Sequence, residues 1–248
     1  MSRITEAINA RIKSVRRSRS IRVPSGYARD VTTISNLNTS EAPADQDFVS
    51  GIFMEMKKMK AELINYQDNW QAVKDAAMNT IGKEGGKYPS SGWKRKILLA
   101  EHSPIRLLRF TIRLEDVPYW VSVHITRHKF GIEHFVSTQR TDRTGIDRNE
   151  MPQNERVTHV ISANAQALIN ISRKRLCMQA SPETRKLWTM VVDEVRKYEP
   201  ELASVMVREC IYRKMCPEMH SCGYCSGLAY KEEVKAYERG SLEGYPGL

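Results

Sequence analysis

The segment at 181–202, SPETRKLWTMVVDEVRKYEPEL, constrains the fold more than any other stretch of the chain. Ser181 is a good helix N-cap, Pro182 suits the first turn, and Glu183 adds a favourable negative charge there. The apolar residues recur at the three- and four-residue steps of one helical face: Leu187, Val191, Val192 and Val195. We therefore expect a long helix that packs in the core of a compact domain.

Two runs upstream of that helix are typical of strands, IRLLRFTIRL at 105–114 and YWVSVHITRHK at 119–129. The second alternates apolar with other side chains, which is the two-residue period of a half-buried strand. VTHVIS at 157–162 predicts a further short strand, and AQALINISRKRL at 165–176 predicts a helix. The fold class is therefore α+β, a single compact domain whose antiparallel or mixed sheet is flanked by long helices.

Another long amphipathic helix is expected before these strands. From Phe48 to Ala77, apolar residues recur mostly at three- and four-residue steps, and the wide stripe that they form is more typical of a core than of a cofactor site. The following stretch at 82–92, GKEGGKYPSSG, is a loop by composition. A shorter helix should begin after Ser91.

The chain carries a surplus of positive charge. Its 39 Lys and Arg exceed its 29 Asp and Glu, which leaves a formal net charge of +10 at pH 7. Such a surplus favours nucleic acid or a phosphorylated small molecule as partner. The Arg-, Ser- and Thr-rich residues at 1–45 form a basic arm, which either is simply solvated or binds nucleic acid. We expect the folded domain at 46–205 and a Cys-rich tail at 206–248.

No apolar run approaches eighteen residues, so we expect no membrane span. The first twenty residues lack the apolar segment of a secretory signal. Both features predict a cytoplasmic protein.

The most specific local motif is Arg127-His128-Lys129, followed after seven residues by Ser137. Cations at the end of a strand, with a hydroxyl group on the returning loop, suit a phosphate or carbonyl oxygen. The plain alternative is a solvated basic turn.

This motif resembles that of flavin-dependent thymidylate synthases, in which an Arg-His-Arg motif is followed after seven residues by a serine. Further matches fall in the same order along 90–200. Arg148-x-x-Met-Pro resembles the family's Arg-x-x-Leu-Pro, Asn164 and Asn170 have the spacing of its two flavin-contacting asparagines, and Arg175 falls where it keeps a substrate-binding arginine. Ser103 replaces a threonine that contacts the flavin phosphate. The coincidence of spacings is more specific than any single motif.

The resemblance implies an enzyme, a flavoprotein methyltransferase of dTMP biosynthesis. It would convert dUMP to dTMP with FAD as cofactor, methylenetetrahydrofolate as carbon donor and NADPH as reductant. The resembled family builds its active sites between the subunits of a homotetramer. Transferred residue by residue, the resemblance implies catalytic roles for Ser137 and Arg175. The substrate-binding residues would be His124, Arg127, Ser137, Gln139, Arg140, Arg148 and Arg175, and the cofactor-binding residues Ser103, His128, Lys129, Asn164, Asn170 and Gln179.

The chain departs from the family's pattern where the family reads the base and tunes the flavin. Phe135 stands in place of a glutamate, and Gln139-Arg140 in place of Arg-Tyr. His124 replaces a glutamine, and Arg106 occupies a position that is usually acidic. These changes leave two alternatives open: another modification of the pyrimidine 5-position, or a non-catalytic homologue that binds nucleotide or nucleic acid. A divergent form with this tail would suit a virus, whose protein would work in the host cytoplasm.

The tail holds a second cluster of reactive residue types. The five cysteines are an odd number, which argues against a disulfide framework and for free thiols or a metal. Four of them lie in CIYRKMCPEMHSCGYC with separations of six, six and three: Cys210, Cys216, Cys222 and Cys225. Only the last pair has the Cys-x2-Cys spacing of a zinc knuckle. Zinc, an iron–sulfur cluster and free, partly buried thiols all remain open.

Overall fold

The computed structural model describes residues 59–239. Its centre is a four-stranded sheet in the order β1-β2-β4-β3, and all three strand pairs are antiparallel. The strands are β1 (Lys60–Tyr66), β2 (Arg109–Pro118), β3 (Ile132–Val136) and β4 (Arg156–Asn164). The register pairs Leu63 with Ile112, and Ile112 with Ile161. The expected α+β class with an antiparallel sheet is thereby confirmed.

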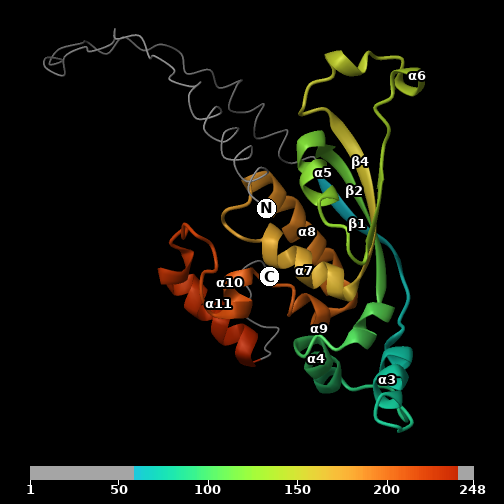
Figure 1. The fold of residues 1–248 in the computed structure, drawn as a ribbon, viewed down its shortest axis with the longest axis vertical. Coiled ribbons are helices and arrows are strands. Elements are labelled where there is room, and N and C mark those ends of the chain that lie inside the picture. The colour runs from blue at the N-terminus through green and yellow to red at the C-terminus, as the bar shows by residue number, and fades with distance from the viewer. Residues whose placement is uncertain (1–58, 240–248) are drawn as a thin grey trace, which may run out of the picture. The chain divides into compact units, whose positions relative to one another are not determined.

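Helices α7 (Ala165–Arg175) and α8 (Pro182–Tyr198) lie along one face of the sheet (Figure 1). Phe110, Ile112 and Leu114 point from β2 into this interface and are fully buried, as the alternation of a strand requires. The helices are α3 (Trp70–Asn79), α4 (Ser91–Leu99), η1 (Ser103–Leu107), α5 (Tyr119–Thr126), α6 (Thr141–Thr144), η2 (Arg148–Glu150), α7 (Ala165–Arg175), α8 (Pro182–Tyr198), α9 (Pro200–Ala203), α10 (Glu209–Arg213), η3 (Tyr224–Ser226) and α11 (Leu228–Arg239).

Helix α8 confirms the prediction from its N-cap and apolar face. The Ser181 hydroxyl accepts a hydrogen bond from the Thr184 backbone N–H at 3.3 Å, and Pro182 occupies the first turn. The apolar face is buried against β1 and α7. Each fully buried Leu or Val contributes about 1.5–3 kcal/mol of transfer free energy. The helix ends at Tyr198, just before Pro200 begins α9.

The expected single helix from Phe48 to Ala77 is wrong over its described part, which is strand β1 followed by helix α3. The residues at 48–58 lie outside the described residues. The chain changes direction at Asp68, whose carboxylate accepts from the Trp70 N–H at 3.1 Å and so starts the new helix. Pairing with β2 then satisfies the backbone of β1, so tertiary contacts override the helical period.

The expected strand at 119–129 is also wrong, because α5 is a helix. Val121 and Ile125 are four residues apart, so they share a buried helical face as readily as they share a strand face. Pro118 ends β2 and precedes the helix, where a missing N–H costs nothing. The expected strand at 105–114 begins only at Arg109, after η1, and strand β3 was not predicted.

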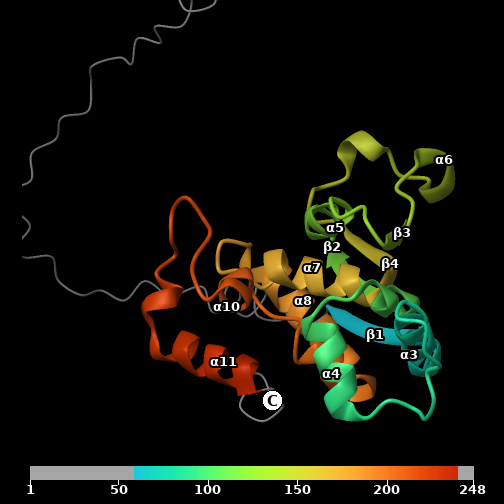
Figure 2. The ribbon, with the colours of Figure 1, turned by 60° about the horizontal axis from the view of Figure 1, so that its bottom comes forward.

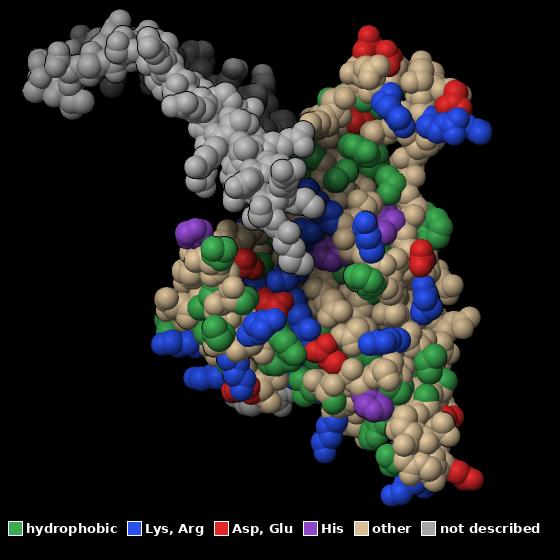
Figure 3. Space-filling model, viewed as in Figure 1, with side chains coloured by type: hydrophobic (Ala, Val, Ile, Leu, Met, Phe, Trp, Pro, Cys, Tyr) green, Lys and Arg blue, Asp and Glu red, His purple; other side chains and the backbone are tan. Residues whose placement is uncertain are grey.

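The tail packs around a small apolar cluster of its own, formed by Val207, Cys210 and Ile211 and joined by α11. The predicted boundaries at 46–205 and 206–248 stay a prediction, and the arm at 1–45 lies outside the described residues. Within 59–239, no helix has the length and apolar character to cross a bilayer. On the face shown in Figure 3, Lys and Arg side chains are scattered among acidic and apolar ones.

Candidate functional site

A cavity of about 640 Å³ lies between the end of β3, the start of α5 and the loop at 147–155; we call it the loop cavity. Tyr119 N–H donates to the Glu155 carbonyl at 2.8 Å and Trp120 N–H to the Gln153 carbonyl at 3.2 Å, which fixes the loop against α5. The cavity is lined by Tyr119, Val136, Ser137, Thr138, Gln139, Arg140, Arg148, Met151, Pro152 and Gln153. This set includes two arginines and no carboxylate, so it favours an anionic ligand.

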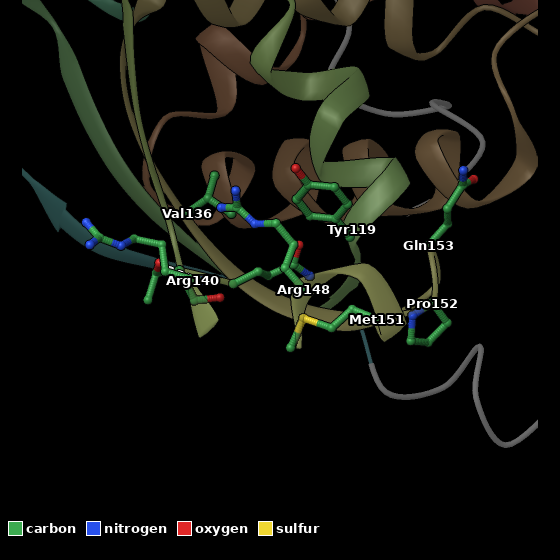
Figure 4. A pocket seen from close by; sticks show the side chains of 10 residues that line it. Tyr119, Val136, Arg140, Arg148, Met151, Pro152 and Gln153 are labelled. Carbon is green, nitrogen blue, oxygen red and sulfur yellow. Dashed lines mark hydrogen bonds between the residues drawn. The ribbon is translucent and has the colours of Figure 1, made fainter. Parts of the chain in front are cut away.

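The two arginines of the loop cavity behave differently. The Arg140 guanidinium donates two hydrogen bonds to the Asp142 carboxylate, from Nε to Oδ1 at 2.9 Å and from Nη2 to Oδ2 at 2.8 Å. Both side chains are more than half exposed, so the ion pair adds little stability. Arg148 has no carboxylate partner within residues 59–239. Figure 4 shows the Arg148 side chain reaching toward Val136 and Tyr119, whereas Arg140 points away. Arg148 is therefore the cation that the cavity offers to a ligand.

Ser137 and Gln139 supply polar atoms to the same cavity. The Ser137 N–H donates to the Thr158 carbonyl at 2.9 Å, and its hydroxyl oxygen accepts from the Thr158 N–H at 3.1 Å. The hydroxyl proton is thus left to donate. The Gln139 side-chain nitrogen Nε2 is buried, and no residue within 59–239 accepts from it. A buried donor without an acceptor costs about 1–3 kcal/mol, so a ligand acceptor here would be stabilising.

The motif at 127–129 lies at the opposite end of α5 and meets the end of α7. The Arg175 Nε donates to His128 Nε2 at 2.9 Å, so that ring nitrogen carries no proton. Burial, then the Arg175 charge, lower the pKa of His128 to about 4. Burial and the neighbouring Arg127 likewise lower the pKa of Arg175. Of the three motif residues, His128 is half-buried against Arg175, whereas Arg127 and Lys129 are exposed.

His124 belongs to the same group. Its Nδ1 lies 3.1 Å from the Thr184 hydroxyl, and burial, Arg175 and Arg127 lower its pKa. We call the four residues His124, Arg127, His128 and Arg175 the arginine–histidine cluster. No carboxylate within 59–239 pairs with either arginine, so the cluster is a site of concentrated positive potential.

A chain of hydrogen bonds connects the backbone carbonyl of His128 to side chains on β3, β4 and α5. His134 Nε2 lies 2.7 Å from the His128 carbonyl oxygen, which can only accept, so Nε2 carries the His134 proton. His134 Nδ1 lies 3.0 Å from His159 Nε2. His159 Nδ1 in turn lies 3.0 Å from the Ser122 hydroxyl. His159 and Ser122 are almost fully buried, and together with His134 they form what we call the histidine chain.

No sequence motif indicates the histidine chain, because its members come from α5, β3 and β4 and share no spacing. A second support was also missed. Gly131 has φ +71°, and a Cβ there would lie 2.6 Å from the Asn164 amide nitrogen. Glycine is therefore needed where the turn after Lys129 meets the start of α7.

The remaining predicted site residues lie around α7. The Asn164 side-chain oxygen accepts from the Ala167 N–H at 2.9 Å and caps the helix. Asn170 is exposed and accepts from Arg173 at 3.3 Å. Lys129 and Ser103 are exposed, and Gln179 Nε2 donates to the His220 carbonyl at 2.7 Å, toward the tail. Within 59–239, no hydrogen bond or ion pair joins the loop cavity's Ser137, Gln139, Arg140 or Arg148 to the arginine–histidine cluster.

No family model and no curated protein matches the sequence. Among solved structures, the UMP/dUMP methylase PolB from Streptomyces cacaoi, bound with 5-Br dUMP, is similar with a TM-score of 0.49 and 14% identity over 59% of this chain and 94% of its own. The flavin-dependent thymidylate synthase ThyX from Helicobacter pylori, complexed with FAD and dUMP, is similar with a TM-score of 0.48 and 12% identity over 60% of this chain and 100% of its own. A likeness at this level concerns the fold alone.

Proposed function

We propose that this chain is a flavin-dependent enzyme that methylates dUMP to dTMP. The observation that carries the proposal is the hydrogen bond between Arg175 and His128, two residues 47 positions apart. Both belong to the motifs that resemble flavin-dependent thymidylate synthases, so the fold brings together residues that the sequence pattern linked independently. A solvated basic turn would not require such a contact.

The nucleotide phosphate would be bound by guanidinium groups. Because Arg175 Nε is held by His128, its two terminal nitrogens are left for a ligand, and no carboxylate within 59–239 competes for them. A forked guanidinium matches a phosphate dianion with two charge-assisted hydrogen bonds. Arg127 and Arg148 would add the further charges, and Ser137 would donate its hydroxyl proton to the nucleotide.

Unused polar groups support a bound flavin. Lys129 and Ser103 are exposed, and Gln139 Nε2, which the resemblance assigns to the substrate, is a buried donor with no acceptor within residues 59–239. His128, Lys129, Asn164 and Asn170 would hold the FAD. When bound, FAD supplies the hydride, which NADPH replenishes, while methylenetetrahydrofolate supplies the carbon. The chain's own part is to orient the nucleotide and to keep water and carboxylates away from it.

A homotetramer would complete the site. The loop cavity and the arginine–histidine cluster are separate groups in one chain, and in each at least one arginine has no acidic partner within residues 59–239: Arg148 in the cavity, Arg127 and Arg175 in the cluster. An arrangement in which one subunit's loop cavity faces another's cluster would bring Arg148 to the same phosphate as Arg175. The mass of the purified protein in solution tests this arrangement, and a monomer would contradict it.

The decisive test is the visible absorption spectrum of the purified chain. We expect a flavin spectrum that NADPH bleaches and dUMP perturbs, and thermal protection by dUMP in the presence of FAD. A colourless protein that takes up no added FAD and is not protected by dUMP would contradict the proposal. Steep, salt-dependent binding of DNA or RNA in its place would support the nucleic-acid-binding alternative.

A second candidate reaction, another modification of the pyrimidine 5-position, follows from His124. Its ring is tied to Thr184 and lies among Arg127 and Arg175, where the resembled family reads the base with a glutamine. A neutral imidazole offers one donor and one acceptor, a different pattern from an amide. Product analysis with dUMP and UMP in parallel distinguishes the two reactions.

A further inference from the structure

All five cysteines of the chain line one small cavity, although they come from separate segments. Cys177 follows α7, Cys210 lies in α10, Cys216 and Cys222 lie in the loop after α10, and Cys225 lies in η3. Figure 2 shows α10 and this loop beside the segment that joins α7 to α8. The sequence pattern had grouped only the four cysteines of the tail.

All five thiols line this one cavity. Cys225 lies near Cys210 and Cys216, and Cys177 lies near Cys210. The cavity has a volume of about 10 Å³, which is room for one water molecule or one ion. Cys210 is 8% exposed. The wall also includes Arg208, Glu209 and Glu218, but five of its eleven residues are cysteines. A cavity of this size with that many thiols suits a single soft cation better than an organic ligand.

We propose that this cavity binds one zinc ion through the thiolates of Cys210, Cys216 and Cys225, with Cys222 or Cys177 as the fourth ligand. Cys222 and Cys225 have the Cys-x2-Cys spacing of a zinc knuckle, and Gly223 between them has φ +79°, the left-handed turn that such a knuckle needs. Each thiol that binds releases its proton to solvent as its zinc–sulfur bond forms.

Zinc binding would draw the tail loop inward. Within residues 59–239, no group of three or more His, Cys, Asp or Glu side chains is already arranged to hold a metal ion. The residues at 214–223 form neither helix nor strand, so they can close on an ion to the roughly 2.3 Å of a zinc–sulfur bond. Metal binding and local folding are then one event, as in other small zinc sites.

The bound zinc would fix the segment that follows Arg175. Arg208 Nε donates to the Leu176 carbonyl at 3.1 Å, and Gln179 donates to the His220 carbonyl at 2.7 Å, so the tail already contacts the segment between α7 and α8. Arg208 is itself held by an ion pair with the buried Glu233. The zinc would thus act as a structural clamp between the tail and the end of α7.

Elemental analysis of the full, untagged protein tests the proposal. We expect about one zinc ion per chain in the wild type, and less than about one tenth of that in Cys216→Ser and in Cys225→Ser. Met219→Ser is the matched control, because Met219 lies in the same loop, is 97% exposed and does not line the cavity. It should retain the zinc.

A second measurement keeps the test valid if a cysteine variant fails to fold. Replacing zinc with Co²⁺ in the wild type should give the sulfur-to-cobalt charge-transfer band and the intense d–d bands of tetrahedral thiolate coordination. A wild type without zinc and without this cobalt spectrum would overturn the proposal, as would iron with acid-labile sulfide or undiminished zinc in Cys216→Ser. The metal content is measured irrespective of flavin, so this result is independent of the proposed function.

Discussion

The arginine–histidine cluster and the loop cavity both offer a guanidinium group to an anion, but they differ in how firmly that group is held in place. In the cluster, Arg175 is half-buried and held by His128, which the histidine chain supports in turn. In the loop cavity, Arg148 is exposed, lies on the three-residue η2 turn, and is positioned by backbone contacts such as its N–H bond to Thr141 at 3.2 Å. A cation that is already ordered loses less entropy on binding, so the cluster should dominate nucleotide affinity.

Removing the ordered guanidinium should have the largest effect. Arg175→Ala is expected to weaken nucleotide binding by about 100-fold or more, because two charge-assisted hydrogen bonds are lost. Arg175→Lys should recover part of the affinity, since it keeps the charge and loses the fork. Titration calorimetry with dUMP measures both, with the exposed Lys197→Ala as control. Unchanged affinity in Arg175→Ala would refute the assignment of the site.

The histidine chain should make the free energy of unfolding fall as the pH is lowered. Burial and then His134 lower the pKa of His159 from 6.5 to about 4 in the folded state. The unfolded chain therefore takes up the proton first, and the stability present above pH 6.5 is lost as the pH falls from 6.5 toward 4. A shift of this size corresponds to about 3 kcal/mol. Urea unfolding at pH 7 and pH 4.5 measures it.

His159→Gln is the matched variant for that experiment, because glutamine keeps a polar side chain that does not titrate. The variant should start less stable at pH 7 and lose less stability than the wild type on acidification. An equal loss in both proteins would assign the acid sensitivity to other groups, of which His128 is the first, since its pKa is also lowered to about 4.

Truncating the exposed cation of the loop cavity should have a smaller effect. Arg148→Ala is expected to weaken nucleotide binding by about tenfold, roughly one charge-assisted hydrogen bond, and to leave the unfolding free energy within about 0.5 kcal/mol. Arg143→Ala is the control, because Arg143 lies on the neighbouring α6, is 69% exposed and does not line the cavity. A loss equal to that of Arg175→Ala would remove the distinction between the two regions.

The sequence predicts elements that depend on local signals, and it does not predict contacts between side chains from distant segments. Ser181 and the apolar face of α8 predict that helix because cap and periodicity are local signals. Motif spacing assigns Arg175 to the substrate and His128 to the cofactor, but it does not predict their hydrogen bond. Nor does it predict the histidine chain, which depends on the register of β3 and β4. The strand expected at 119–129 failed because residues four apart satisfy both periods. Local sequence signals predict individual helices, whereas the pairing of strands determines which polar side chains come into contact.

The smallest effect is expected from a change at Gln139, which should raise the stability of the ligand-free protein and weaken ligand binding. Gln139 Nε2 is buried in the wall of the loop cavity without an acceptor in the described part of the chain. Gln139→Met keeps the length of the side chain and removes that donor, so it should raise the unfolding free energy of the ligand-free protein by up to about 1 kcal/mol. The same change should weaken nucleotide or flavin binding a few-fold, because the ligand loses its hydrogen bond. Thermal melting with and without FAD and dUMP measures both, and a variant that is less stable without ligand would show that this donor is satisfied in the free protein.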